Sequence, residues 1–183
     1  MFDWKPCIEM IAGADSIAVL PHLSADGDAL GSAFGLAAAL AAGGKHVCVF
    51  LEEEPEPRLR FLIPAGIRYI VAETPDCTDS AQPRPELAIA VDCADRNRLG
   101  RRGSLFFGAP QRIKIDHHIE RDSFGMLNYT NPDWSATCEG IWQLLCCAPW
   151  RFRDCLRENA PEWVHSTALC LYSGIVSDTG GFA

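Results

Sequence analysis

Aspartate residues, accompanied by histidine in the first and third cases, occur in three short segments of this 183-residue sequence. The first segment runs from His22 to Asp28 and includes Asp26, the second begins at Asp92, and the third is Asp116-His117-His118. Several carboxylates in one crevice repel one another, so one of them would take up a proton unless cations compensated the charge. Carboxylate and imidazole ligands without thiolate favour a metal such as manganese over a structural zinc. These residue types therefore predict a centre for divalent metal ions.

The number and spacing of the carboxylates suit two ions. Counting Asp178, the four candidate carboxylates carry one negative charge each, which two divalent ions would balance. A loop can place His22 and Asp26 on one ion and turn Asp28 toward the other. Asp92 would then lie between the ions as a bridging ligand. We therefore expect two divalent ions, with Mn²⁺ first and Mg²⁺ or Co²⁺ as alternatives.

Each motif also has an ordinary structural interpretation. An Asp-Gly-Asp sequence such as residues 26–28 is usually a turn, and a His-His pair such as residues 117–118 is usually surface or core. The sequence around Asp178 could be a helix-ending turn. Three clusters that hold three of the five histidines nevertheless favour the metal centre.

The elements that must position these residues alternate between short and long apolar runs. Buried strands are expected at residues 16–20, 46–51, 87–91 and 112–115, and helices at residues 29–42, 136–147 and 161–176. This pattern predicts an α/β fold with a parallel sheet flanked by helices on both faces. Ligands bind beyond the carboxyl ends of the strands in such sheets, and the three motif segments follow expected strands directly. Residues 73–86, rich in proline and polar residues, are expected to be a surface connection.

Glycines after the first motif suggest close packing. Gly27 would let the backbone pass close to the ions or adopt a positive φ. Gly31 and Gly35 share one face of the expected helix, and we expect them to let that helix lie close against the sheet. The N-terminus of this helix would face the crevice and favour phosphate there.

Composition limits the partners and the compartment. The net charge of −8 argues against a broad basic face that binds long duplex nucleic acid. The nine cysteines are an odd number without a CxxC pair, which favours reduced thiols in a cytoplasmic protein. The N-terminus lacks the features of a signal peptide, and no apolar run is long enough to span a membrane.

Four motifs in order resemble the DHH phosphoesterase family, which is named for its Asp-His-His motif. They are His22–Ser32, Asp92–Gly100, Asp116–His118 and Gly174–Phe182. Residues 135–139 are similar to the helix start that the family has between the last two motifs. The resemblance implies that residues 1–183 form a DHH catalytic, metal-binding domain.

The resemblance also implies a role for each site residue. Its implied ligands are His22, Asp26 and Asp92 for one ion, and Asp28, Asp92, His117 and Asp178 for the other. His118 would face the substrate phosphate as a charge stabiliser or proton donor, with Asp92 beside it in the catalytic centre. Asp116 would support its neighbours. Arg98 would contact phosphate or, as an alternative, form a structural ion pair.

Within the family, the first motif is most similar to bifunctional oligoribonucleases that also dephosphorylate 3′-phosphoadenosine 5′-phosphate. The implied reaction is hydrolysis of short oligoribonucleotides or of that nucleotide by a metal-bound hydroxide. A cyclic dinucleotide phosphodiesterase, a family II inorganic pyrophosphatase and a non-catalytic metal- or nucleotide-binding module are the alternatives. A homodimer is compatible with the resemblance. Family members continue past the fourth motif into a smaller substrate-binding domain, which we expect to be absent from a chain that ends at Ala183.

Overall fold

Six parallel strands form a single sheet at the centre of the molecule. The computed structural model describes residues 2–72, 84–147, 149–157 and 159–182. The strands are β1 (Ser16–Pro21), β2 (His46–Leu51), β3 (Arg68–Val71), β4 (Leu87–Val91), β5 (Gln111–Asp116) and β6 (Leu127–Thr130). Their order is β3-β2-β1-β4-β5-β6, and each neighbouring pair is parallel. The chain therefore reverses its direction of winding between β1 and β4, where open α/β sheets form a ligand crevice.

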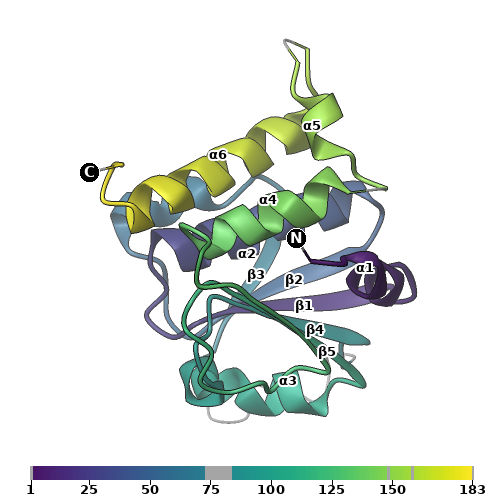
Figure 1. The fold of residues 1–183 in the computed structure, drawn as a ribbon, viewed down its shortest axis with the longest axis vertical. Helices are drawn as coiled ribbons and strands as arrows, with labels where there is room; N and C mark the ends of the chain where they lie inside the picture. The colour runs from purple at the N-terminus through teal and green to yellow at the C-terminus, as the bar shows by residue number, and fades with distance from the viewer. Residues whose placement is uncertain (1, 73–83, 148, 158, 183) are drawn as a thin grey trace.

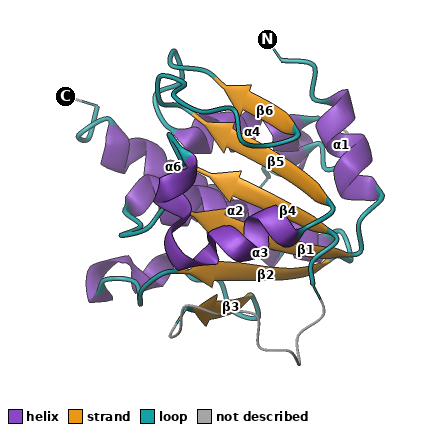
Figure 2. Cartoon of the chain, turned by 90° about the horizontal axis from the view of Figure 1, so that it is seen from below, coloured by secondary structure: helices purple, strands orange, loops and turns teal. Residues whose placement is uncertain are grey.

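Helices cover both faces of this sheet. They are α1 (Lys5–Ala12), α2 (Gly27–Ala42), α3 (Gly103–Gly108), α4 (Thr137–Cys146), α5 (Phe152–Cys155) and α6 (Glu162–Asp178), with 3₁₀ helices η1 (Pro57–Leu62) and η2 (Arg96–Arg102). Figure 1 shows α2, α4 and α6 on one side of the sheet and α3 on the other. Figure 2 looks onto the face that α3 covers. The predicted fold class is thus confirmed.

Two apolar cores hold the layers together. The larger core lies between the sheet and α2, α4 and α6, and it includes the fully buried Leu30, Phe34 and Ile141. The smaller core lies under α3 and includes Leu99 and Phe106. Full burial of one such side chain contributes about 1.5–3 kcal/mol. Because β1 and β4 are apolar on both faces, they are buried between these cores, and only their ends can carry polar groups.

The glycines of α2 pack against α6, so the expectation that they bring α2 against the sheet is wrong. A Cβ atom on Gly31 would lie 2.5 Å from the carbonyl oxygen of Cys170, and one on Gly35 would lie 3.1 Å from the side chain of Leu171. Another face of α2 meets the sheet with a large side chain. The ring of Phe34 lies 6.1 Å from the ring of Tyr69 in β3.

Gly27 likewise faces α6. Its φ angle is not positive, so that part of the expectation is wrong. A Cβ atom on Gly27 would lie 2.6 Å from the hydroxyl oxygen of Ser177 in the last turn of α6. The three glycines therefore let the two helices run close together, and α6 brings its C-terminal end to the start of α2.

Of the expected surface connection at residues 73–86, residues 73–83 lie outside the described part of the chain. Residues 84–86 lead directly into β4. The amide N–H of Glu86 donates to Ser16 at the start of β1, which ties this approach to the sheet.

Candidate metal centre

The structure brings the six residues of the expected metal centre to the carboxyl edge of the sheet. The segments that carry them follow β1, β4 and β5, with one further residue from the last turn of α6: His22, Asp26, Asp28, Asp92, His117 and Asp178. The ends of β1 and β4 lie side by side at the point where the winding reverses. The sheet topology therefore places the first two motifs together, while packing of α6 on α2 brings in Asp178.

His22, Asp26 and Asp92 form one group of potential ligands, with atoms within 4.8 Å of one another. The Nε2 atom of His22 lies 3.7 Å from Asp26 Oδ2 and 3.4 Å from Asp92 Oδ2. The Nδ1 atom of His22 contacts the carbonyl oxygen of Leu23, which can only accept a hydrogen bond. Nδ1 therefore carries a proton, and once Nε2 has lost its own proton, the Nε2 lone pair can bind a cation beside the carboxylates.

His117 gathers a second group with Asp28 and Asp178. Its Nε2 atom lies 3.1 Å from Asp178 Oδ2, 3.6 Å from Asp92 Oδ1 and 4.0 Å from Asp28 Oδ2. Asp92 thus reaches both groups, through Oδ2 toward His22 and through Oδ1 toward His117. The same residues carry the two sets of ligands that the family resemblance implies, and their assignment to two ions stays a prediction.

Asp26 combines two tasks at the start of α2. Its Oδ1 atom accepts hydrogen bonds from the amides of Asp28 and Ala29, each at 3.1 Å, which makes Asp26 the N-cap of the helix. Its Oδ2 atom faces His22. Burial would raise the pKa of Asp26, but hydrogen bonds from His22 and from the helix amides hold this pKa down at about 2. The Asp26 carboxylate is therefore charged at neutral pH.

Asp28 is completely buried between the N-termini of two helices. Although it belongs to α2, its carboxylate accepts the first amides of α4, from Thr137 at 2.6 Å and from Cys138 at 2.9 Å. Burial and the nearby charge of Asp92 raise the pKa of Asp28 to about 7 without a metal. A cation at this point would remove the cause of the shift, since it would favour the charged carboxylate.

Asp92 has an unusual backbone conformation. Its φ angle is +58°, although β4 ends only one residue earlier, and its amide donates to the carbonyl oxygen of Ile115 at 3.0 Å. The hydroxyl of Thr137 donates to Asp92 Oδ1 at 3.0 Å and fixes the carboxylate. A non-glycine residue with positive φ is uncommon, and such residues concentrate at functional sites.

His118 lies at the exposed rim of the cluster and is oriented by Asp116. Its Nδ1 atom lies 2.8 Å from Asp116 Oδ1 and 3.5 Å from Asp92 Oδ1. The hydrogen bond to Asp116 raises the pKa of His118 above its usual value. Burial alone would raise the pKa of Asp116, but hydrogen bonds from His118 and the charge of Lys114 lower it. Asp116 therefore holds the His118 ring in place and favours its protonated form.

Lys114 completes this arrangement from inside the protein. It is fully buried, and its Nζ atom lies 3.5 Å from Asp116 Oδ2 and 3.0 Å from the carbonyl oxygen of Asp122, to which it donates. Its ammonium group also lies 5.3 Å from the centre of the Phe124 ring. The positive charge of the buried Lys114 is thus compensated by a carboxylate, a carbonyl oxygen and an aromatic ring.

Replacing Lys114 with methionine is expected to lower the free energy of unfolding by about 3–5 kcal/mol, because Asp116 would be left as a buried charge without its cation. Chemical denaturation would measure this loss. The control is Lys5→Met, which removes an exposed lysine paired only with Glu9 and should change stability by less than about 1 kcal/mol. Equal effects of the two substitutions would show that Lys114 does not compensate Asp116.

The donor set fits a divalent cation. Within the described residues, His117 Nε2 is a buried polar atom without a hydrogen-bond partner, and oxygens of three aspartates surround it at 3.1–4.0 Å. A buried nitrogen without a partner is costly unless something binds it. A metal ion would satisfy this nitrogen and compensate the carboxylates together.

Three contributors to the centre do not stand out in the sequence. Thr137 and Cys138 bind Asp28 through their backbone amides, and a backbone donor has no residue type that could mark it. The small residues at 135–139 were the available signal, because they predict a helix start whose free amides can bind a carboxylate. Lys114 was hidden inside an expected strand.

Arg98 lies beside the centre without an acidic partner among the described residues, so its alternative role in a structural ion pair is not observed. Its carbonyl oxygen accepts the amide of Leu23 at 2.8 Å, which links its loop to the loop that begins at His22. The Arg98 side chain lines a cavity of about 380 Å³ together with His118.

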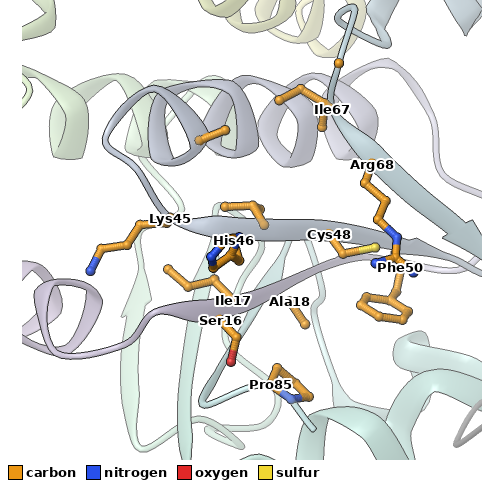
Figure 3. A pocket seen from close by; sticks show the side chains of 13 residues that line it. Ser16, Ile17, Ala18, Lys45, His46, Cys48, Phe50, Ile67, Arg68 and Pro85 are labelled. Carbon is orange, nitrogen blue, oxygen red and sulfur yellow. The ribbon is translucent and has the colours of Figure 1, made fainter. Parts of the chain in front are cut away.

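A different cavity, of about 370 Å³, lies at the amino ends of β1, β2 and β3 (Figure 3). The strands begin there with Ser16, His46 and Arg68, all of which line the cavity. None of the described residues that line it carries a carboxylate. This end of the sheet therefore lacks the acidic donors of the carboxyl edge.

The described residues also give the state of the cysteines and the character of the helices. Eight cysteines are described, and all eight are free thiols. Within the same residues, none of the helices has both the length and the apolar character that crossing a bilayer requires.

The fold and the cluster define an α/β protein with a carboxylate and imidazole centre at the carboxyl edge of a parallel sheet. Residues 16–175 match the profile of the DHH family, N-terminal domain, and the chain belongs to this family.

Curated relatives carry related names. The chain is 32% identical over 169 residues to the bifunctional oligoribonuclease and PAP phosphatase NrnA of Thermus thermophilus, covering 91% of this chain and 44% of that protein. It is 29% identical over 182 residues to the probable bifunctional oligoribonuclease and PAP phosphatase NrnA of Streptococcus mutans, covering 100% and 51%. The chain therefore spans about half the length of the curated relatives it matches.

A solved structure shares the fold. The crystal structure of an exopolyphosphatase-related protein from Bacteroides fragilis superposes with a TM-score of 0.84 at 24% identity, covering 98% of this chain and 50% of that one. At this identity the likeness supports the architecture alone.

Proposed function

We propose that this chain carries the metal centre of a phosphoesterase that hydrolyses short oligoribonucleotides, 3′-phosphoadenosine 5′-phosphate, or both. The observation that carries the proposal is the pair of ligand groups joined by Asp92, with its two oxygens facing His22 and His117. Membership of the DHH family and the names of the relatives point to the same chemistry. Residues 1–183 would be the DHH catalytic domain, and contacts to the base and ribose would come mainly from a further domain.

His22, Asp26 and Asp92 would hold one divalent ion, and Asp28, Asp92, His117 and Asp178 the other. Manganese is the proposed metal, because the donors are carboxylates and imidazoles without thiolate. Two bound ions would supply positive charge beside the substrate and lower the pKa of a water molecule.

The chain's own residues would orient and stabilise the reacting phosphate. Asp116 holds His118 through Nδ1 and raises the pKa of His118, which favours the positively charged ring. A charged donor at the rim would stabilise the negative charge that develops on the phosphoryl oxygens. The same ring can donate a proton to the leaving oxygen. At the start of α4, the hydroxyl of Thr137 holds Asp92 in position and the amide of Thr137 holds Asp28.

Parallel assays of the intact protein test the proposal. The protein is incubated with Mn²⁺ and, separately, a short RNA, 3′-phosphoadenosine 5′-phosphate, pyrophosphate and a cyclic dinucleotide. Release of mononucleotides and adenosine monophosphate is expected. Rapid turnover of pyrophosphate alone, or of the cyclic dinucleotide alone, would replace the proposal by one of its alternatives. Manganese binding without any turnover would favour a binding module.

Manganese should stabilise the protein more strongly as the pH rises from about 6 to about 8. Without metal, Asp28 has its pKa raised to about 7, and His22 has its pKa raised to about 9 because the carboxylates of Asp26 and Asp92 outweigh burial. Both groups must lose a proton to bind metal.

Asp28 and His22 make stability depend on pH in the same direction. Each favours its protonated form in the metal-free fold, so its contribution to stability is present at low pH and declines as the pH rises toward the raised pKa. The increase in Tm on adding Mn²⁺ should therefore grow with pH in thermal unfolding scans. An increase that stayed constant over this range would contradict the assignment of Asp28 and His22 as ligands.

The proposed compartment is the cytoplasm, on the basis of the free thiols. The expected reaction does not need a basic surface, since the bound ions would compensate the substrate charge.

A further inference from the structure

A second binding feature adjoins the candidate metal centre. The cavity of about 380 Å³ beside His118 is lined by Ala94, Asp95, Arg98, His118, Ile119 and Arg121. Its volume falls within the range of small-molecule sites. Since His118 also forms a cluster with Asp92 and His117, the cavity and the metal centre share a wall.

Two arginines in this cavity have no acidic partner. Within the described residues, neither Arg98 nor Arg121 forms an ion pair or a side-chain hydrogen bond. The nearby carboxylates are already engaged. Asp122 binds Arg96 through two hydrogen bonds of 2.6 and 3.0 Å, and Asp95 accepts the amide of Asn97 at 2.9 Å.

Acidic residues outnumber basic ones in this chain, which has a net charge of −8, so carboxylates are plentiful. Arg98 and Arg121 nevertheless have no acidic partner among the described residues. Arg121 would find a partner in Asp122, its neighbour in sequence, if a surface ion pair were its role. Instead Arg96 takes that carboxylate. Two free guanidinium groups therefore face one cavity, where a phosphate can accept parallel N–H bonds from each.

The backbone fixes Arg98 relative to the metal ligands. Its amide donates to the carbonyl oxygen of Asp95 at 3.1 Å, and its carbonyl oxygen accepts the amide of Leu23 at 2.8 Å. His22 precedes Leu23 directly, so the loop that carries Arg98 is tied to the loop that carries a ligand. Arg121 follows His118 by three residues and lines the same cavity. The cavity is thus positioned for a group linked to the phosphate at the metal centre.

We propose that Arg98 and Arg121 form a subsite for a second phosphate group of the substrate, next to the phosphate that is hydrolysed. This inference rests on the proposed function and deepens it. The subsite would favour substrates with two phosphate groups, such as a 5′-phosphorylated dinucleotide, over those with one. The positive charge of the two arginines, and not contacts to the nucleotide base, would produce this preference.

Kinetics on the intact protein with Mn²⁺ test the subsite. The substrates are the adenine dinucleotide with a 5′-phosphate, pApA, and the same dinucleotide without it, ApA. Arg121→Ala and Arg98→Ala should each lower kcat/KM for pApA by roughly 10- to 100-fold, mainly through KM. The loss for ApA should be much smaller. Arg121→Lys should restore part of the loss, because it restores the charge.

The matched control is Arg68→Ala, which removes an exposed arginine from the cavity at the other end of the sheet (Figure 3). This variant should hydrolyse both dinucleotides like the wild type. An equal loss for pApA and ApA in the Arg121 variant, or no loss for either, would overturn the subsite.

Equilibrium binding gives a readout that does not depend on activity. Calorimetry would measure binding of pApA to the metal-free protein, in which turnover is not expected. Arg121→Ala should weaken this binding and Arg68→Ala should not, whereas equal binding by the wild type and Arg121→Ala would overturn the proposal. If the wild type hydrolyses neither the dinucleotides nor 3′-phosphoadenosine 5′-phosphate, the proposed function fails, and the binding result alone decides the subsite.

Discussion

Replacing Asp92 with asparagine is expected to lower phosphoesterase activity by about 100- to 1,000-fold and to weaken manganese binding. The two Asp92 oxygens face His22 at 3.4 Å and His117 at 3.6 Å, so both ligand groups lose a charge at once. Asparagine keeps the shape, can accept the hydrogen bond from Thr137, and tolerates the positive φ angle. The effect should therefore come from charge. Steady-state kinetics and calorimetric titration with Mn²⁺ measure it.

Two further variants separate the causes. Asp92→Ala should also lower the free energy of unfolding, by about 1 kcal/mol or more, because alanine is strained at positive φ. Asp133→Asn removes an exposed carboxylate outside the cluster and should leave metal binding unchanged. If Asp92→Asn bound manganese with the affinity of the wild type and kept full activity, Asp92 would not be the shared ligand.

Gly31→Ala should damage the centre although Gly31 is not a ligand. Its Cβ atom would lie 2.5 Å from the carbonyl oxygen of Cys170, a backbone atom that cannot rotate away. α6 would have to move from α2 and take Asp178 with it. We expect a loss of about 1–3 kcal/mol in the free energy of unfolding and weaker manganese binding. Chemical denaturation and metal titration would show both effects.

The matched control is Gly103→Ala at the start of α3. Nothing lies within 4 Å of a Cβ atom there, and the backbone is already helical. Alanine should keep or raise stability, by up to about 1 kcal/mol, since it has the higher helix propensity. A Gly31 variant as stable and as tightly metal-bound as the Gly103 variant would show that close packing of α2 and α6 does not position Asp178.

The central strands were predictable because burial on both faces requires continuous apolar runs. The expected strands at residues 46–51 and 87–91 coincide with β2 and β4. The strand expected at 16–20 is one residue shorter than β1 at its end, and the strand expected at 112–115 is one residue shorter than β5 at each end. The three expected helices correspond to α2, α4 and α6 within two residues. Long apolar segments ended by glycine or begun by proline define such elements locally.

The edges of the sheet were not predicted. β3 begins with the exposed Arg68, and β6 is Leu-Asn-Tyr-Thr, with a buried tyrosine between partly exposed residues. Each has one strand neighbour and four residues, so neither needs a continuous apolar run. The short α1 and α3 were missed for the same reason, since tertiary contacts and not length stabilise them.

The candidate ligands were predictable to different degrees. His22 and Asp92 follow apolar strands, and the topology of a parallel sheet places strand ends together. Asp178 follows a helix, and only the contact between α2 and α6 determines where that helix ends. The direction in which the α2 glycines face was mispredicted because helix periodicity shows which residues share a face but not what covers it.

The position of the ligands along the chain has a consequence for synthesis. The first of the proposed ligands is residue 22 and the last is residue 178, at the end of α6. β1 pairs with β2 and β4, so it cannot take its place in the sheet before those strands have emerged, and the group around His117 stays incomplete until α6 has emerged and packed. Full metal loading would therefore follow translation of α6. From that moment the ions would join the loop after β1 to the end of α6 and oppose the separation of these elements.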